Sequence, residues 1–282
     1  MDSRELGLLL AQQLFKVEDL HYGLWDSGEV PTMVALPVAQ QRYNDFLLER
    51  LSGLPRGARV LDVGCGVGKL LTLLLTRGFL AEGVNPSPTM CRMIRERLER
   101  HGFPPTGVYE CCFEDFPAHE RPQAFDAAIF SESFQYIPMD QALAMVKKVV
   151  KPGGRMIVCD FFKTDAHGDG RPGDGTFGGG HPLRALRPAL DAGGFTVLED
   201  TDITARVSPN LALVDDMLMQ RAKPAASTLG RYLDARYPKT TALVRWLARK
   251  KIAKIERKYL NGHRTPQVFE RYKSYRMVVC RV

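Results

Sequence analysis

The sequence has 282 residues, of which 45% are hydrophobic and 25% charged, and its formal net charge is +7. These values favour one large globular domain with an elaboration over two independent domains. No stretch approaches 18 consecutive apolar residues and the N-terminus lacks a signal-peptide cleavage site, so we expect a soluble, cytoplasmic protein. The six cysteines and six histidines show no metal-ligand spacing, so we expect reduced thiols and no metal site.

The predicted elements begin with a mostly helical segment over residues 4–50, interrupted around HYGLWDSGEVPT. Apolar strands then alternate with helices from residue 58 to about residue 165, which is typical of a parallel sheet covered on both faces. These strands are expected within RVLDVG, LAEGVN, GVYECC, DAAIFS and GRMIVCD.

A stretch rich in Gly, Asp and Pro follows at residues 163–181 and is predicted to be a long mobile loop, of the kind that often forms an active-site lid. A helix, a strand, further helices over residues 208–265 and a final strand complete the chain. The expected fold class is α/β with a doubly wound sheet. Its predicted units are an N-terminal helical lid segment (1–50), a cofactor-binding core (51–206), a helical cap (207–265) and a final strand returning to the core (266–282).

The stretch RVLDVGCGVGKL at residues 59–70 contains the main binding motif. A dinucleotide fingerprint would need a third glycine where Lys69 stands, and a P-loop would need glycine at Val63 and a hydroxyl at Leu70. Neither pattern matches. An apolar strand that ends in Asp62 and breaks into glycines at alternate positions instead predicts a ligand without a pyrophosphate, held against bare backbone.

With this turn, the sequence resembles the class I S-adenosylmethionine-dependent methyltransferases. FLAEGVNPSPTM, YECCFEDFP, FDAAIFSESFQYIP and VVKPGGRMIVCDFF follow in the order of the family's later motifs. The resemblance implies a seven-stranded sheet in the order 3-2-1-4-5-7-6 with an antiparallel last strand. It also implies S-adenosyl-L-methionine as the cofactor.

The resemblance also implies which residues hold that cofactor. The three glycines would cradle its methionine part. The loop after the second strand would meet the ribose through the amide of Asn85, where relatives often carry a carboxylate. The loop after the third strand would meet the adenine. The tip of the fourth strand completes the set. The expected cofactor-binding residues are Asp62, Gly64, Gly66, Gly68, Asn85, Cys112, Phe113, Glu114 and Ser131.

Methyl transfer from a sulfonium is an in-line displacement, so the enzyme mainly positions the nucleophile and excludes water. A phenol or carbon acid would gain from a base, for which His181, Glu132 and Tyr136 are the candidates, whereas an amine would need none. Tyr22 and Trp25 belong to an aromatic segment similar to one in tocopherol-type and sterol-type methyltransferases. They are interpreted as a lid over the cofactor, the alternative being that they staple neighbouring helices.

The positive charge is concentrated in the tail: residues 221–282 hold 17 of the 39 basic but 3 of the 32 acidic residues. Residues 243–260 read as a basic amphipathic helix that packs on the domain or contacts an anionic substrate or a membrane surface. The predicted acceptor is a small lipophilic or anionic molecule, methylated at C, O or N. A nucleic-acid methyltransferase and a catalytically weak cofactor-binding protein remain as alternatives, and the oligomeric state is open.

Overall fold

The computed structural model describes residues 21–105, 107–259 and 262–282. Within them, seven strands form one sheet in the order β3-β2-β1-β4-β5-β7-β6, and β7 is antiparallel to both of its neighbours. The predicted fold class, strand order and antiparallel last strand are confirmed. The strands are β1 (Arg59–Val63), β2 (Leu80–Val84), β3 (Val108–Tyr109), β4 (Phe125–Ser131), β5 (Val150–Lys163), β6 (Thr196–Asp202) and β7 (Lys273–Arg281).

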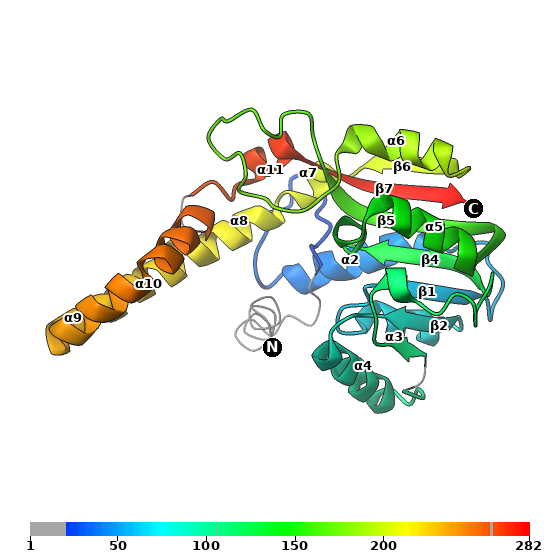
Figure 1. Ribbon diagram of the computed structural model, residues 1–282, viewed down its shortest axis with the longest axis horizontal. Coiled ribbons are helices and arrows are strands. Elements are labelled where there is room, and N and C mark those ends of the chain that lie inside the picture. Colours follow the sequence, from blue (N-terminus) through cyan, green and yellow to red (C-terminus); the bar gives the residue numbers. More distant parts are fainter. Residues whose placement is uncertain (1–20, 106, 260–261) are drawn as a thin grey trace.

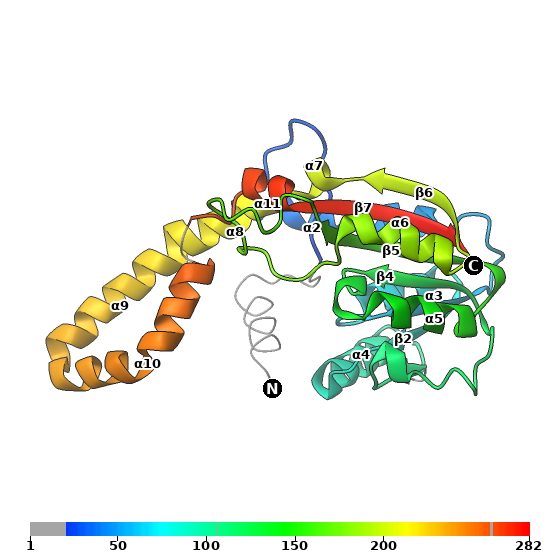
Figure 2. The ribbon, with the colours of Figure 1, turned by 45° about the horizontal axis from the view of Figure 1, so that its top comes forward.

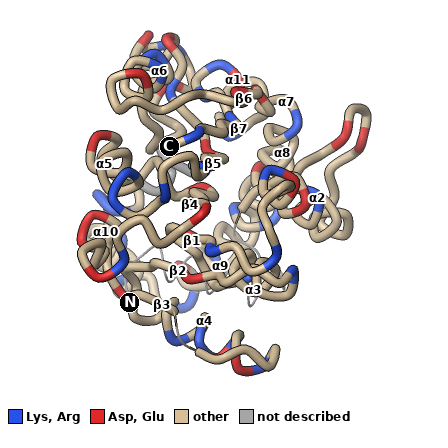
Figure 3. The backbone as a smooth tube through the Cα atoms, turned by 90° about the vertical axis from the view of Figure 1, so that its right-hand side faces the viewer, with Lys and Arg blue, Asp and Glu red and all other residues tan. Residues whose placement is uncertain are grey.

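Helices cover both faces of the sheet (Figure 1). Side chains alternate along each strand, so Ala127 and Ile129 of β4 face one apolar cluster while Ala128 and Phe130 face the other. The first cluster includes residues of α2 (Leu36–Glu49), α3 (Lys69–Thr76) and α4 (Pro88–Arg100), and the second includes residues of α5 (Met139–Val149) and α6 (Leu183–Ala192). Both signs of charge are interspersed along the outer surfaces of these elements (Figure 3).

Two predicted elements differ from the structure. The strand expected within GVYECC is limited to Val108–Tyr109, at the edge of the sheet. The N-terminal segment is helical in α2, but residues 21–35 run as an irregular segment before it, because this stretch holds two glycines and a proline, which disfavour a helix. The helix expected over residues 4–20 lies outside the described residues.

Residues 208–265 are largely helical, as predicted, but their longest helices project away from the sheet instead of covering it (Figure 1, Figure 2). None of the helices that the structure describes is both long and apolar enough to cross a membrane. The helices of this region are α8 (Asn210–Asp215), the π-helix η3 (Asp216–Ala222), α9 (Lys223–Arg236) and α10 (Pro238–Tyr259); α7 (Thr204–Val207) precedes it and α11 (Pro266–Tyr272) follows it.

Candidate active site

The turn after β1 holds its three glycines at positive φ. A Cβ on Gly64 would lie 2.4 Å from the Cβ of Ser133, and one on Gly68 would lie 3.0 Å from Ile94. Close packing within the protein therefore restricts these two positions to glycine. A Cβ on Gly66 would meet no atom within 4 Å. Of the three glycines, Gly66 is therefore the one with open space where a side chain would stand. This space lies at the carboxyl end of β1.

Asp62 precedes this turn and is 1% exposed. Its Oδ2 atom has no hydrogen-bond partner among the described residues, and burial raises the pKa of its carboxyl to about 7. A buried carboxylate oxygen without a donor is unfavourable until a ligand supplies one. The position therefore suits a ligand with a cationic amine.

Asn85 directly follows β2 and is 4% exposed. Its Nδ2 donates to the carbonyl oxygen of Gly66 at 3.2 Å, and its Oδ1 accepts from the N–H of Ser87 at 2.9 Å. Ser87 in turn caps α4 through a bond from the N–H of Met90. The Asn85 amide thus joins the glycine turn to the start of α4, and its predicted contact with a ribose stays a prediction.

These features fit the cofactor that the sequence indicates. The methionine part of S-adenosylmethionine carries an ammonium group that can donate to Asp62 Oδ2, and the space over Gly66 admits a chain close to the backbone. Ligands of open parallel sheets bind at this edge, beyond the carboxyl ends of the strands.

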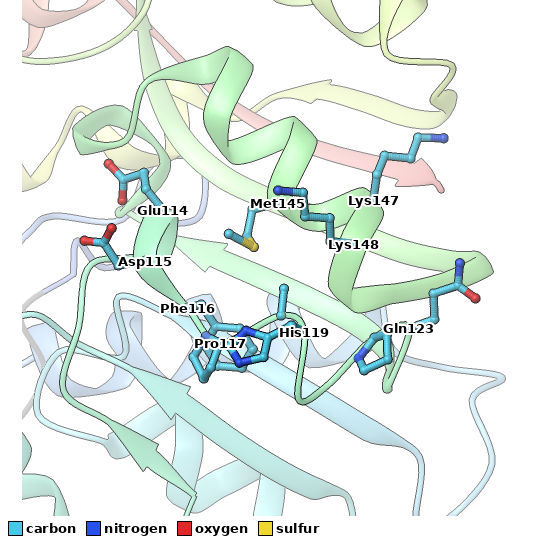
Figure 4. A pocket seen from close by; sticks show the side chains of 11 residues that line it. Glu114, Asp115, Phe116, Pro117, His119, Gln123, Met145, Lys147 and Lys148 are labelled. Atoms are coloured by element: carbon cyan, nitrogen blue, oxygen red, sulfur yellow. The ribbon is translucent and has the colours of Figure 1, made fainter.

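The predicted adenine loop follows β3 and forms the short helix η1 (Phe113–Asp115). Phe113 is buried and Cys112 is exposed. Glu114 lines an open groove of about 630 Å³ that also includes Lys147 and Lys148 of α5 (Figure 4). This groove lies between η1 and α5, and its lining does not include the glycine turn. Contacts of these three loop residues with adenine stay predictions.

Glu132 follows β4 with a left-handed backbone, at φ 55°. Its Oε1 accepts from the backbone N–H of Tyr22 at 2.9 Å and from the hydroxyl of Tyr275 at 2.7 Å. The Tyr275 hydroxyl lies 3.0 Å from that of Tyr43, which lies 3.2 Å from Ser131 Oγ. Burial raises the pKa of Glu132, although His21 and the two donors oppose this. The structure therefore brings two predicted site residues, Glu132 and Ser131, into one hydrogen-bonded network.

The aromatic segment at residues 21–25 is anchored on consecutive residues. The backbone N–H groups of residues 22–25 donate, in order, to Glu132, Asn210, Ala39 and Arg206 at 2.8–2.9 Å. The Asn210 amide also donates to the carbonyl oxygen of residue 23 at 2.7 Å. The segment is therefore fixed to the residue that follows β4 and to α2, α7 and α8.

Tyr22 and Trp25 differ in their surroundings. Tyr22 is half-buried, whereas Trp25 is 1% exposed. Gly23 between them allows close packing, because a Cβ there would lie 2.6 Å from the Cβ of Ala39 in α2. Burial of Trp25 favours the interpretation that this residue packs neighbouring helices together. Tyr22, in contrast, lies beside Glu132 through its backbone N–H.

His181 ends the glycine-rich loop and holds it to the short helix η2 (Phe134–Tyr136). Its Nε2 lies 3.0 Å from the carbonyl oxygen of Phe134 and 2.9 Å from that of Ile137. Two carbonyl acceptors around one nitrogen assign a proton to Nε2. Tyr136, on the same helix, is 62% exposed. Catalytic roles for both residues stay predictions.

Asp160 lies near the end of β5 and is 1% exposed. Its carboxylate accepts from the backbone and side-chain nitrogens of Gln135 and from the N–H of Phe161. Burial raises the pKa of Asp160 to about 8. Asp160 therefore fixes the local backbone and joins β5 to η2.

Sequence reasoning missed a cluster of aromatic rings next to Glu132. Its neighbouring ring centroids lie 5.2–6.3 Å apart. The rings come from five separate segments and belong to Tyr22, Phe161, Phe177, Phe269 and Tyr275. The alternating pattern of the final strand could have indicated that Tyr275 is buried, but not which residues it contacts.

Comparisons with known proteins identify similar sequences and similar folds. The sequence model of the methyltransferase domain family matches residues 60–154. The chain is 31% identical to the O-methyltransferase rstn1 of Aspergillus nomiae, over 68% of this chain and 87% of that protein. It is 32% identical to the methyltransferase GfsG of Streptomyces halstedii over 56% of this chain, and that match spans 58% of the relative.

Among solved structures, the geranyl diphosphate C-methyltransferase of Streptomyces coelicolor, in complex with S-adenosyl-L-homocysteine, superposes with a TM-score of 0.67. The two chains share 17% identity over 97% of this chain and 92% of the other, a likeness that concerns the fold. The sequence matches, the strand order and the glycine turn agree with one another. The chain therefore belongs to the class I S-adenosylmethionine-dependent methyltransferases and is an enzyme that uses S-adenosylmethionine.

Proposed function

We propose that this enzyme transfers a methyl group to a hydroxyl oxygen of a small, mainly apolar acceptor. The observation that carries the proposal is the position of the Glu132 carboxylate. Glu132 adjoins Ser133, which packs against Gly64 of the glycine turn, and two donors hold its Oε1. A fixed carboxylate, on a residue next to one that packs on the cofactor turn, can take the proton of an acceptor hydroxyl.

When bound, S-adenosylmethionine supplies an electrophilic methyl group on a sulfonium. Asp62 and the space over Gly66 would hold its methionine part. Glu132 would orient the acceptor hydroxyl and receive its proton as the oxygen attacks. The Tyr22 N–H and the Tyr275 hydroxyl keep the Glu132 carboxylate in one orientation during that step.

The aromatic cluster supports an apolar acceptor. Tyr22 and Tyr275, two of its members, donate to Glu132. Tyr22 and Phe161 are half-buried, while the other three members are buried. Aromatic surface near a sulfonium also excludes water and stabilises positive charge. The relative from Aspergillus nomiae that is named an O-methyltransferase agrees with transfer to oxygen.

The test is a panel of apolar phenols, enols, isoprenoid alkenes and amines, each incubated with S-adenosylmethionine. Release of S-adenosylhomocysteine and the mass and NMR spectrum of the product identify the methylated atom. Transfer to a phenol or enol oxygen is expected. Transfer to carbon or nitrogen alone contradicts the proposal, and cofactor binding without turnover on any acceptor indicates a catalytically weak binding protein.

The Glu132→Gln variant tests the proposed base. It should lower kcat by about 10² to 10⁴ while S-adenosylhomocysteine binds as in the wild type. The matched control is Glu99→Gln, on the exposed side of α4, which should leave kcat unchanged. If both variants turn over at the wild-type rate, Glu132 is not the base.

A further inference from the structure

The arm formed by α9 and α10 exposes large apolar side chains. It projects from the rest of the molecule (Figure 1, Figure 2). On α10, Leu243 and Val244 are more than half exposed, Trp246 is 60% exposed and Leu247 is 68% exposed. Contiguous exposed apolar groups of this size mark an interaction surface.

An ion pair fixes which side of α10 these residues occupy. Arg245 contacts Asp234 of α9 at 2.7 Å, so Arg245 points toward α9. Successive residues of a helix are about 100° apart, which places Leu243 and Leu247 opposite Arg245. We call the side of α10 with Leu243, Val244, Trp246 and Leu247 the outer face of α10.

Basic residues surround this outer face. Lys239, Lys250 and Lys251 fall within the same half of the helix as Leu243 and Leu247. Residues 223–253 contain eight basic residues and one acidic residue, Asp234. The arm is therefore strongly cationic, whereas charges of both signs are mixed over the helices of the core (Figure 3).

We propose that the outer face of α10 docks on an anionic lipid surface. Lysine ammonium groups can reach anionic headgroups while their stems, Leu243 and Leu247 enter the apolar boundary. A tryptophan ring such as that of Trp246 has the apolar body and polar N–H that this boundary favours. Packing against a second copy through the same face would bring like charges together, which is unfavourable.

Vesicle binding tests the proposal with the full chain. Flotation is measured with phosphatidylcholine vesicles, with and without about 30% phosphatidylglycerol, at about 0.1 M and about 1 M salt. We expect binding to the anionic vesicles at low salt, and at least about tenfold weaker binding to neutral vesicles or at high salt. Equal binding to both vesicle types would overturn the proposal.

The double variant Trp246→Ser/Leu247→Ser should weaken anionic-vesicle binding about tenfold. The matched control, Leu229→Ser/Tyr232→Ser, removes exposed apolar groups from the side of α9 that faces away from Asp234, and should bind as the wild type does. Equal loss in both variants, or in neither, would contradict docking through the outer face. Circular dichroism confirms that each variant is folded.

A second measurement needs no variant. The chain has two tryptophans; Trp25 is 1% exposed and Trp246 is 60% exposed, so Trp246 reports a change of environment. Anionic vesicles should shift its fluorescence to the blue, and no shift would overturn the proposal. Two other results would also overturn it: an oligomer that the double variant dissociates without vesicles, or DNA or RNA binding that exceeds vesicle binding and is lost in that variant.

Discussion

The substitution Asp62→Asn tests two consequences of burying a carboxyl beside the glycine turn. One is a pH-dependent free energy of unfolding, and the other is a contact with the amine of the cofactor. Burial raises the pKa of Asp62 to about 7 from its ordinary 3.8. The folded protein therefore holds this proton more tightly than the unfolded chain does, and the free energy of unfolding falls as pH rises from about 4 to about 7. Asparagine does not titrate, so position 62 of the variant causes no such fall in the free energy of unfolding.

The magnitude follows from the shift. A difference of about 3 pKa units corresponds to about 4 kcal/mol at pH values above both pKa values. Between pH 5 and pH 8, the unfolding free energy of Asp62→Asn should rise relative to the wild type by about 3 kcal/mol. The same variant should bind S-adenosylhomocysteine about 10- to 100-fold more weakly, because it loses the charged acceptor for the ligand's amine.

Guanidinium unfolding of the ligand-free protein and calorimetry of S-adenosylhomocysteine binding measure the two effects. The matched control is Asp126→Asn: despite partial burial, Lys151 and the N–H of Arg59 lower the pKa of Asp126. That variant should be less stable by a similar amount at pH 5 and pH 8, with cofactor affinity unchanged. A stability difference for Asp62→Asn that does not grow with pH would refute the burial argument, and unchanged affinity would refute the contact with the amine.

Three further predictions concern the same edge of the sheet. Gly66→Val should abolish cofactor binding in calorimetry while the protein stays folded; Gly57→Val, also at positive φ with no atom within 4 Å of its Cβ, should bind normally. Asn210→Ala leaves the N–H and carbonyl of residue 23 unpaired and should lower the free energy of unfolding by about 2 to 4 kcal/mol; a change below about 0.5 kcal/mol would contradict the anchoring role. In a pH profile of kcat, activity should fall as pH drops through the burial-raised pKa of Glu132, and a profile flat down to pH 4 would contradict its role as base.

Most of the fold could be predicted because its signals are local. Apolar strands alternate with helices along the chain, and the glycine turn needs its residue types within a few positions. The order of the strands came from the resemblance to a family. The short β3 was overestimated because an edge strand pairs on one side only, so neighbouring apolar residues need not extend it.

The site was only partly predictable because its contacts join distant residues. The bond from Tyr275 to Glu132 spans 143 positions and that from Gly23 to Asn210 spans 187, and no local pattern encodes either. The direction of the arm was missed for a similar reason. Apolar residues at helical spacing on α10 indicate an amphipathic helix, but not whether the protein itself covers the apolar side.

The glycine-rich loop is also held at several points. Lys273, which is fully buried, donates from Nζ to the carbonyl oxygen of Gly179 at 2.7 Å. Asp169 contacts Arg271 at 2.7 Å. Between these points, however, a Cβ on Gly170 or Gly175 would meet no atom within 4 Å. The amides of Gly168 and Gly170 bond within the loop itself, to Asp174. The amides of residues 22–25 bond instead to other elements of the protein.

The difference between residues 22–25 and the glycine-rich loop predicts which of the two segments closes over the site. Because the N–H groups of residues 22–25 are already bonded within the protein, they should exchange slowly before any ligand is added. Cofactor plus acceptor should then slow exchange mainly in residues 164–181, beyond the effect of cofactor alone, since water must be excluded only while the methyl group is transferred. Hydrogen exchange with mass spectrometry measures both segments. Extra protection confined to residues 22–25 would show that the aromatic segment opens and closes despite its hydrogen bonds.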